Sequence, residues 1–150
     1  MIKNLELTIY KQSDIFEAEN YSREFSGAMY YFLHKVKKIK IPQCSYIKIR
    51  LVNKNIPNNF EFTLKSGVLY LSGSHNFDSY VQLNRKEKLQ FQYKLICDIL
   101  EIIFIKFEID VQQLDNIKDE LSTNDGQMKI EWKLKGLDKK MVRKIIIEID

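Results

Sequence analysis

The stretch NRKEKLQFQYKLICDILEIIFIKF, residues 84–107, carries the strongest local pattern in the sequence. Its apolar residues recur at intervals of three and four, which is the spacing of one helical face. The stripe comprises Leu89, Tyr93, Ile96, Leu100, Ile103 and Phe107, and it is widened by Ile99 and Phe104. Asn84, with Glu87 three residues later, predicts a capping box at the start of this helix. A helix this apolar on most sides belongs in a core, where we expect it to lie across a sheet.

Segments on both sides of this stretch predict two more helices. Upstream, residues 17–38 repeat apolar side chains at helical spacing, and Pro42 is expected to end that helix because it disfavours helical geometry in the residue before it. Downstream, Asp110 is placed to cap a short helix, and residues 111–121 keep helical spacing. The chain should therefore contain two main helices and one short one.

Short stretches that alternate apolar and polar side chains predict the strands. They are residues 4–10, 44–52, 59–64, 68–72, 79–83, 127–134 and 141–150. Residues 65–67, KSG, indicate a turn between the third and the fourth of them. Because strands follow strands and most connections are of hairpin length, we expect an α+β fold. It should be a single domain, residues 1–150, with an antiparallel sheet of about six to seven strands packed against the helices on one face.

The composition indicates a globular protein. Of the 150 residues, 45% are hydrophobic and 29% are charged. Residues 1–10 lack the apolar run of a signal peptide, and the longest apolar run, residues 100–107, is far short of the roughly 20 residues that span a bilayer. Cys44 and Cys97 stand outside any CxxC spacing, and Cys97 falls in the apolar helix. We therefore expect a reduced, cytoplasmic protein with no membrane segment.

Charge is distributed in patches, although the net charge is only +4. Between Lys35 and Lys54 there are seven Lys or Arg residues and no acid. Between Glu108 and Asp125 there are six acids against one base. The acids are Glu108, Asp110, Asp115, Asp119, Glu120 and Asp125. Patches of one sign steer charged partners toward a protein, so both runs are candidate binding surfaces, with scattered solvated faces as the alternative.

Catalytic residue types concentrate in one window, SGSHNFDSY, residues 72–80. His75 and Asp78 lie there, but nothing resembles the GxSxG turn that presents a nucleophilic serine. Gly, Ser, Asn and Asp are also the residues that make turns, which favours a loop. His34 and the two cysteines show no zinc spacing, and no glycine-rich phosphate loop is present. We therefore expect no enzyme, no metal site and no cofactor.

Nucleic-acid binding is an alternative that the sequence leaves open. The basic stretch 35–54 could form a stripe, and tyrosines near it could stack on bases. The candidate tyrosines are Tyr10, Tyr30, Tyr31, Tyr46 and Tyr70. Against this interpretation, the basic residues alternate with core positions and most of these aromatic residues are equally explained as core.

The pattern LNRKEKLQFQYKLICDILEIIFIKFEIDVQQLDNIKDEL, residues 83–121, resembles the central part of small bacterial immunity proteins that neutralise polymorphic or contact-dependent toxins. In several such families a basic, capped lead-in opens a long apolar helix, and a short helix and a terminal hairpin follow it. The resemblance implies a non-enzymatic cytoplasmic protein that binds and blocks one cognate toxin domain.

Immunity families share no single set of binding residues, so the resemblance assigns none here. Charge offers a separate guide, because inhibitors of basic toxins present acidic surfaces that speed and specify association. The acidic run from Glu108 to Asp125 is therefore the first candidate for partner binding. The net positive charge departs from what a simple nuclease inhibitor would show, so the basic stretch facing an acidic partner stays open as well.

Overall fold

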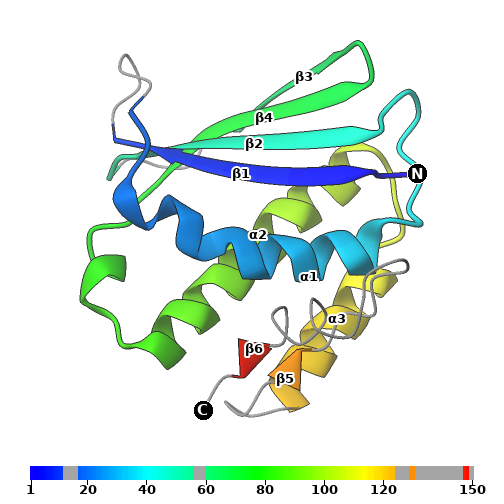
Figure 1. The fold of residues 1–150 in the computed structure, drawn as a ribbon. Helices are drawn as coiled ribbons and strands as arrows, with labels where there is room; N and C mark the ends of the chain where they lie inside the picture. The colour runs from blue at the N-terminus through cyan, green and yellow to red at the C-terminus, as the bar shows by residue number, and fades with distance from the viewer. Residues whose placement is uncertain (12–16, 56–59, 124–128, 131–146, 149–150) are drawn as a thin grey trace, which may run out of the picture. The chain divides into compact units, whose positions relative to one another are not determined.

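The computed structural model describes residues 1–11, 17–55, 60–123, 129–130 and 147–148 (Figure 1). The chain divides into two compact units, residues 1–83 and residues 84–150. Both helices and strands are present, so the α+β class is confirmed. The expectation of a single domain stays a prediction.

The first unit is built on a four-stranded sheet. Its strands are β1 (Asn4–Tyr10), β2 (Tyr46–Asn53), β3 (Glu61–Lys65) and β4 (Val68–His75), in the order β1-β2-β4-β3. β2 pairs in parallel with both β1 and β4, and only β3 runs antiparallel, along β4. The predicted antiparallel sheet of six to seven strands is therefore wrong, and the sheet is mixed.

A helical crossover explains the parallel pairing of β1 with β2. The chain leaves β1, forms a 3-10 helix, η1 (Asn20–Phe25), and continues directly into α1 (Ser26–Val36) before it enters β2. Parallel neighbours need a connection of this length, since a short turn returns the chain antiparallel. Figure 1 shows α1 running alongside β1 on one side of the sheet. The helix expected over residues 17–38 is thus a 3-10 turn followed by a shorter α-helix.

The core of this unit lies between α1 and one face of the sheet. Leu5, Ile47 and Leu69 are neighbours in register across β1, β2 and β4, and all three are buried. Successive side chains of a strand point to opposite faces, so the residues between them form the other, more exposed face. The buried side of α1 supplies Ala28, Met29, Tyr31, Phe32 and Val36.

The turn between β3 and β4 has the predicted position. Ser66 and Gly67 both have positive φ, at 53° and 80°, as the two central residues of a type I′ hairpin turn require. Further along β4, Gly73 lies beneath the ring of Phe60, and a Cβ added at this glycine would lie 2.4 Å from the ring atom Cδ1. Gly73 thus leaves the space that the Phe60 ring fills.

The window SGSHNFDSY is the end of a strand followed by a turn. Residues 79–83, predicted as a strand, instead contain a 3-10 helix, η2 (Tyr80–Gln82). Phe77 and Tyr80 are fully buried, and both lie against Tyr21 and Phe25 with ring centroids 5.1 to 6.1 Å apart. The strand prediction failed because these two aromatic residues anchor a turn rather than one face of a strand.

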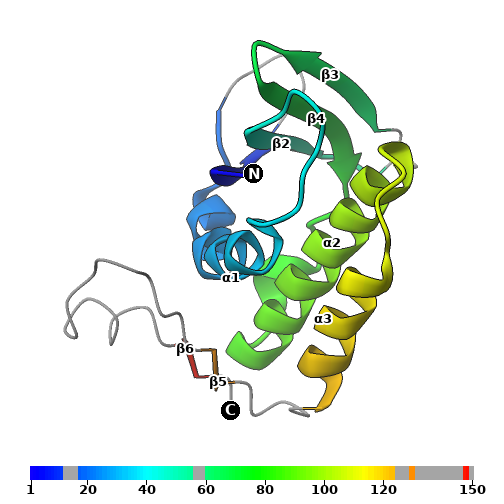
Figure 2. The ribbon, with the colours of Figure 1, turned by 90° about the vertical axis from the view of Figure 1, so that its right-hand side faces the viewer.

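The second unit contains the long apolar helix that residues 84–107 predict. α2 (Arg85–Lys106) begins at the predicted capping box, with the Asn84 side chain accepting from the Glu87 backbone and the Glu87 side chain accepting from the Asn84 backbone. α3 (Gln112–Thr123) follows and runs beside α2 (Figure 2). At its start, the carboxylate of Asp110 accepts from the N–H of Gln112, as predicted for a capping residue.

Two short strands lie within the described part of the C-terminal region. β5 (Lys129–Ile130) pairs antiparallel with β6 (Ile147–Glu148). The rest of the two predicted terminal strands, residues 127–134 and 141–150, lies outside the described residues. Within the ranges that the structure describes, no helix combines the length and the apolar character needed to cross a bilayer.

Candidate functional site

Four of the six predicted acidic residues are exposed and lie on one connected segment of the second unit. Glu108 and Asp110 belong to the connection between α2 and α3, and Asp115 and Asp119 belong to α3. We call these four residues the acidic surface. Glu120 falls within α3, but its side chain and the whole of Asp125 lie outside the described residues.

The local fold explains why these acids face solvent. Glu108 has a positive φ of 56°, which ends α2 in the left-handed conformation common after a helix, and its N–H donates to the carbonyl of Ile105. On α3, Leu114 and Ile117 are buried, and Asp115 and Asp119 occupy the exposed side. Asp110 has a structural role besides its charge, because one of its oxygens caps α3.

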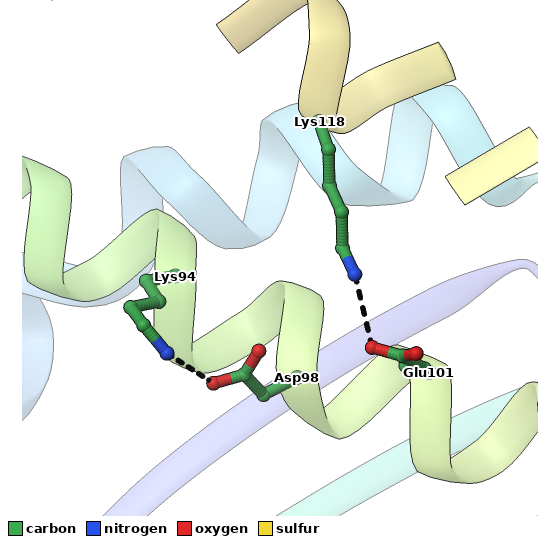
Figure 3. Close-up of polar contacts among 4 residues, drawn as sticks. All are labelled: Lys94, Asp98, Glu101 and Lys118. Atoms are coloured by element: carbon green, nitrogen blue, oxygen red, sulfur yellow. Dashed lines mark hydrogen bonds and ion pairs between the residues drawn. The ribbon is translucent and has the colours of Figure 1, made fainter. Parts of the chain in front are cut away.

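The single base of the acidic run is turned to an acid outside it. Lys118 Nζ lies 2.9 Å from Glu101 Oε2 on α2 (Figure 3). This hydrogen bond is the main cause that raises the pKa of Lys118, and the negative charges of Glu101 and Asp115 act in the same direction. Because Glu101 compensates the charge of Lys118, the acidic surface keeps more of its negative potential than the sequence count implies.

The basic stretch 35–54 is divided between two places in the first unit. Lys35 and Lys37 lie at the C-terminal end of α1, where Lys35 lies over the ring of Tyr31 at 5.5 Å from its centroid. Lys48 and Arg50 lie on β2, on the face opposite the buried residues Ile47 and Ile49. The structure therefore does not bring the stretch together as one continuous stripe.

The tyrosines proposed for base stacking are divided in the same way. Tyr31 is buried, whereas Tyr30 is exposed on α1. Tyr46 and Tyr70 lie on the more exposed face of the sheet, where Lys48 pairs in register with Tyr70 and the Arg50 guanidinium lies 5.2 Å from the Tyr70 ring centroid. Lys48 Nζ also lies 3.9 Å from Glu6 Oε2. This face therefore combines aromatic rings with charges of both signs.

Histidines and cysteines form no reactive arrangement in the described residues. His75 packs edge-on against Phe77, with ring centroids 5.2 Å apart. Burial is the main cause that lowers the pKa of His34, and the nearby charges of Lys37, Lys35 and Lys38 lower it further. Burial raises the pKa of the Cys97 thiol to about 12, so this thiol stays protonated as a small core residue. Among the residues described, no group of three His, Cys, Asp or Glu side chains is placed to hold a metal ion.

An open groove follows the outer edge of β1, and the sequence did not predict it. Its volume is about 430 Å³, and it is lined by Asn4, Leu5, Glu6, Leu7, Thr8, Ser22, Ser26, Met29, Tyr30 and Leu33. A second hollow of about 510 Å³ shares Leu7, Thr8, Ser22 and Ser26 with it and continues toward Glu19 and Arg23. Finding this groove requires knowing that β1 is an edge strand, which depends on the order of strands in the sheet.

These features define a class of protein: an α+β chain with a mixed sheet, an exposed acidic surface and an open sheet edge. In comparisons with family models, curated proteins and solved structures, nothing matches this chain.

Proposed function

We propose that this chain is an immunity-type binding protein that neutralises one cognate toxin domain in the cytoplasm by forming a stoichiometric complex, with no catalytic step of its own. The observation that carries the proposal is the acidic surface, and the one base within its stretch of sequence, Lys118, is engaged by Glu101. The resemblance of residues 83–121 to bacterial immunity proteins supports the same function.

The acidic surface suits a basic partner for a physical reason. A cluster of exposed carboxylates attracts a positively charged domain over a distance of about 10 Å at ordinary ionic strength. Such a cluster raises the association rate and disfavours partners of the same charge. A cationic surface that binds nucleic acid in a toxin would be attracted in this way, and a bound immunity protein would cover it.

The first test identifies the partner. A tagged form of the protein is recovered from its native cells at moderate salt, and the eluted proteins are identified by mass spectrometry. We expect one partner in a one-to-one ratio, the C-terminal domain of a large secreted protein, and we expect co-expression of this chain to relieve the toxicity of that domain. Recovery of nucleic acid, or of nothing specific, would contradict the proposal.

The second test addresses the acidic surface. Reversing Asp115 and Asp119 together to Lys should slow association with the toxin domain roughly tenfold at low salt, and the difference should shrink as salt rises. The matched control is Glu61→Lys, which reverses another exposed acid on β3 of the first unit. Equal association rates for the double variant and the control would exclude this surface, even if the toxin complex itself were found.

Nucleic-acid binding is the second candidate, and one observation favours it. Tyr46, Lys48, Arg50 and Tyr70 share the more exposed face of the sheet, as do stacking and phosphate-binding residues of proteins that hold single strands on a sheet. Binding of a labelled single-stranded oligonucleotide should then weaken steeply with salt and should be lost in Arg50→Ala. A salt-tolerant protein complex in the first test would favour the immunity proposal instead.

A further inference from the structure

β1 is one of the two edge strands of the four-stranded sheet, and the described residues pair only half of its outer edge. At the C-terminal half, the N–H of Ile9 donates to Ser22 Oγ at 3.2 Å and the carbonyl of Ile9 accepts from Glu19 at 2.8 Å. The N–H of Lys11 donates to Glu17 in the same ladder, at 2.9 Å. Residues 17–19 thus already act as a short antiparallel strand against this end of β1.

The other half of the edge, at Leu5 and Leu7, presents backbone groups to the groove. The N–H and C=O of one residue in a strand point to the same side, and this side alternates along the strand. Because the backbone groups of Ile9 bond outward, the N–H and C=O groups of Leu7 and Leu5 also point outward, away from β2. Asn4 Oδ1 accepts from the N–H of Leu5 at 2.9 Å. For the N–H and C=O of Leu7 the described residues provide no hydrogen-bond partner.

The hydrogen bonds of β2 support this orientation independently. The N–H of Tyr46 donates to the carbonyl of Gly67, just before β4, and the N–H of Lys54 donates to the carbonyl of His75, at the end of β4. Both donors are even-numbered, so the even-numbered residues of β2 bond toward β4. The odd-numbered residues, such as Ile47, therefore bond toward β1. In a parallel pair, the residue in register with such a bonded residue directs its own groups away from the partner strand. Ile47 is in register with Leu5, so Leu5 and Leu7 face the groove.

From this edge we propose that the β1 groove binds an extended segment of a partner protein, which adds to the sheet as a strand beside Leu5 and Leu7. An unpaired edge supplies main-chain hydrogen bonds to such a segment, and side-chain pockets beside the edge supply selectivity. The groove follows five residues of β1, Asn4 to Thr8, or about 16 Å at the rise of a strand. It therefore fits a segment of about five residues.

Side chains along the groove define the chemistry of the segment. On the α1 side, an added strand meets Met29, Tyr30 and Leu33, so the residues directed there should be apolar. On the other face of the sheet, its residues lie beside Glu6, whose Oε1 accepts from Asn4 Nδ2 and whose Oε2 lies 3.9 Å from Lys48 Nζ. This ion pair is long and the Glu6 side chain is 52% exposed, so a basic residue of the segment can pair with it there. The partner segment should alternate apolar residues with Lys or Arg.

The groove favours a single strand over a second copy of this chain. Pairing two copies through β1 would bring the α1 of each copy to the same side of the joined sheet. Tyr30 and Leu33 of α1 already line the groove beyond β1 and occupy the place that the other helix would need. A lone extended segment carries no such helix, so it enters where a second folded copy is blocked.

The test uses a labelled, capped seven-residue peptide of alternating Lys and Val as the probe. We expect saturable binding to the full chain by fluorescence anisotropy, and slower hydrogen exchange at the amide of Leu7 when the probe is bound. Tyr30→Asp places a charge in the groove and should weaken binding roughly tenfold, as the loss of one aromatic anchor does. Leu64→Asp changes an exposed apolar residue on β3, at the opposite edge of the sheet, and should leave the affinity unchanged.

Three outcomes would overturn the proposal. They are no binding of the probe at millimolar concentration, equal affinity of the Tyr30→Asp and Leu64→Asp proteins, and no change at the Leu7 amide in the complex. Protection of this amide that grows with protein concentration in the absence of the probe would show a second copy at the edge instead. The groove is lined by residues of the first unit and the acidic surface by residues of the second, so the Tyr30→Asp variant and the reversal of Asp115 and Asp119 test the two proposals separately.

Discussion

Lys118 on α3 donates a hydrogen bond of 2.9 Å to Glu101 on α2, and this pair is a polar contact between the two helices (Figure 3). The side chains are 39% and 41% exposed, so water screens the pair in part. The pair connects residues 17 positions apart, and it also removes the one positive charge from the acidic run.

A double-mutant cycle measures the strength of the Lys118–Glu101 interaction. Lys118→Gln and Glu101→Gln should each destabilise the protein slightly, with a coupling free energy of about 0.2–1 kcal/mol in urea unfolding. The pair Lys94–Asp98 is the control, because it lies within α2 and does not join two helices. Hydrogen exchange in α3 should become faster when Lys118 or Glu101 is substituted, but not when Lys94 or Asp98 is substituted. Equal exchange rates in the two sets of variants would show that the Lys118–Glu101 pair does not hold α3 in place.

The same pair gives an alkaline pH dependence. The folded-state pKa of Lys118 is raised above its ordinary value of 10.5, so its stabilising effect is fully present below that value and is lost as pH rises through the folded pKa. Lys118→Gln removes this step. Unfolding curves of the two proteins between neutral and strongly alkaline pH should therefore converge at the alkaline end, and parallel curves would argue against the pair.

Gly73 is predicted to be intolerant of any side chain. Gly73→Ala places a methyl group against the ring of Phe60, and displacing an aromatic ring from a packed site costs about 1–3 kcal/mol. Combining Gly73→Ala with Phe60→Leu should recover part of this loss, because the smaller side chain leaves room for the methyl group. If the two substitutions were simply additive in thermal or urea unfolding, contact with Phe60 would not be the reason for the glycine.

The capping box at the start of α2 gives a prediction for a local interaction. Asn84→Ala removes the acceptor of the Glu87 N–H and should lower the free energy of unfolding by about 1 kcal/mol. Asn84→Asp keeps an acceptor and adds a favourable charge at the helix start, so it should be at least as stable as the native protein. Equal loss in both variants, measured by urea unfolding, would show that the side-chain cap contributes little.

The features that the sequence predicted correctly are local ones. The α2 capping box depends on residues three apart, and the exposure of Asp115 and Asp119 follows from helical spacing around Leu114 and Ile117. Strand order was not predictable in this way, because it depends on which distant segments pair. One signal was present and was missed: β1, a helix and β2 follow one another, and this order favours a parallel pair joined by a crossover.

Other features depend on contacts between distant segments, which the residue types alone do not indicate. Phe77 and Tyr80 lie among Ser, Asn and Asp, which indicated an exposed turn, yet both are fully buried. Their burial depends on Tyr21 and Phe25, which come from a different part of the chain. The β1 groove likewise exists only because the sheet ends at β1 and α1 runs beside it. The site proposed from the groove therefore required the three-dimensional arrangement.

His34 predicts how stability changes with acid. In the folded protein, burial and the charges of Lys37, Lys35 and Lys38 hold its pKa below the ordinary value of 6.5, and its Nδ1 is buried with no hydrogen-bond partner in the described residues. As pH falls below 6.5, the unfolded chain takes up a proton that the folded chain does not, so stability declines until pH passes the folded pKa. His34→Gln should remove this part of the decline in stability. The part that comes from protonation of carboxylates should remain.

Two measurements check the role of His34. Urea unfolding is measured at several pH values between mildly alkaline and mildly acidic. As pH falls, the free energy of unfolding should decrease more steeply for the native protein than for His34→Gln. Nuclear magnetic resonance of the imidazole protons gives the folded pKa directly, and Lys37→Gln should raise it, because the charge of Lys37 is the largest electrostatic cause of the shift. A slope unchanged by His34→Gln, or a pKa unaffected by Lys37→Gln, would show that His34 does not control the acid response.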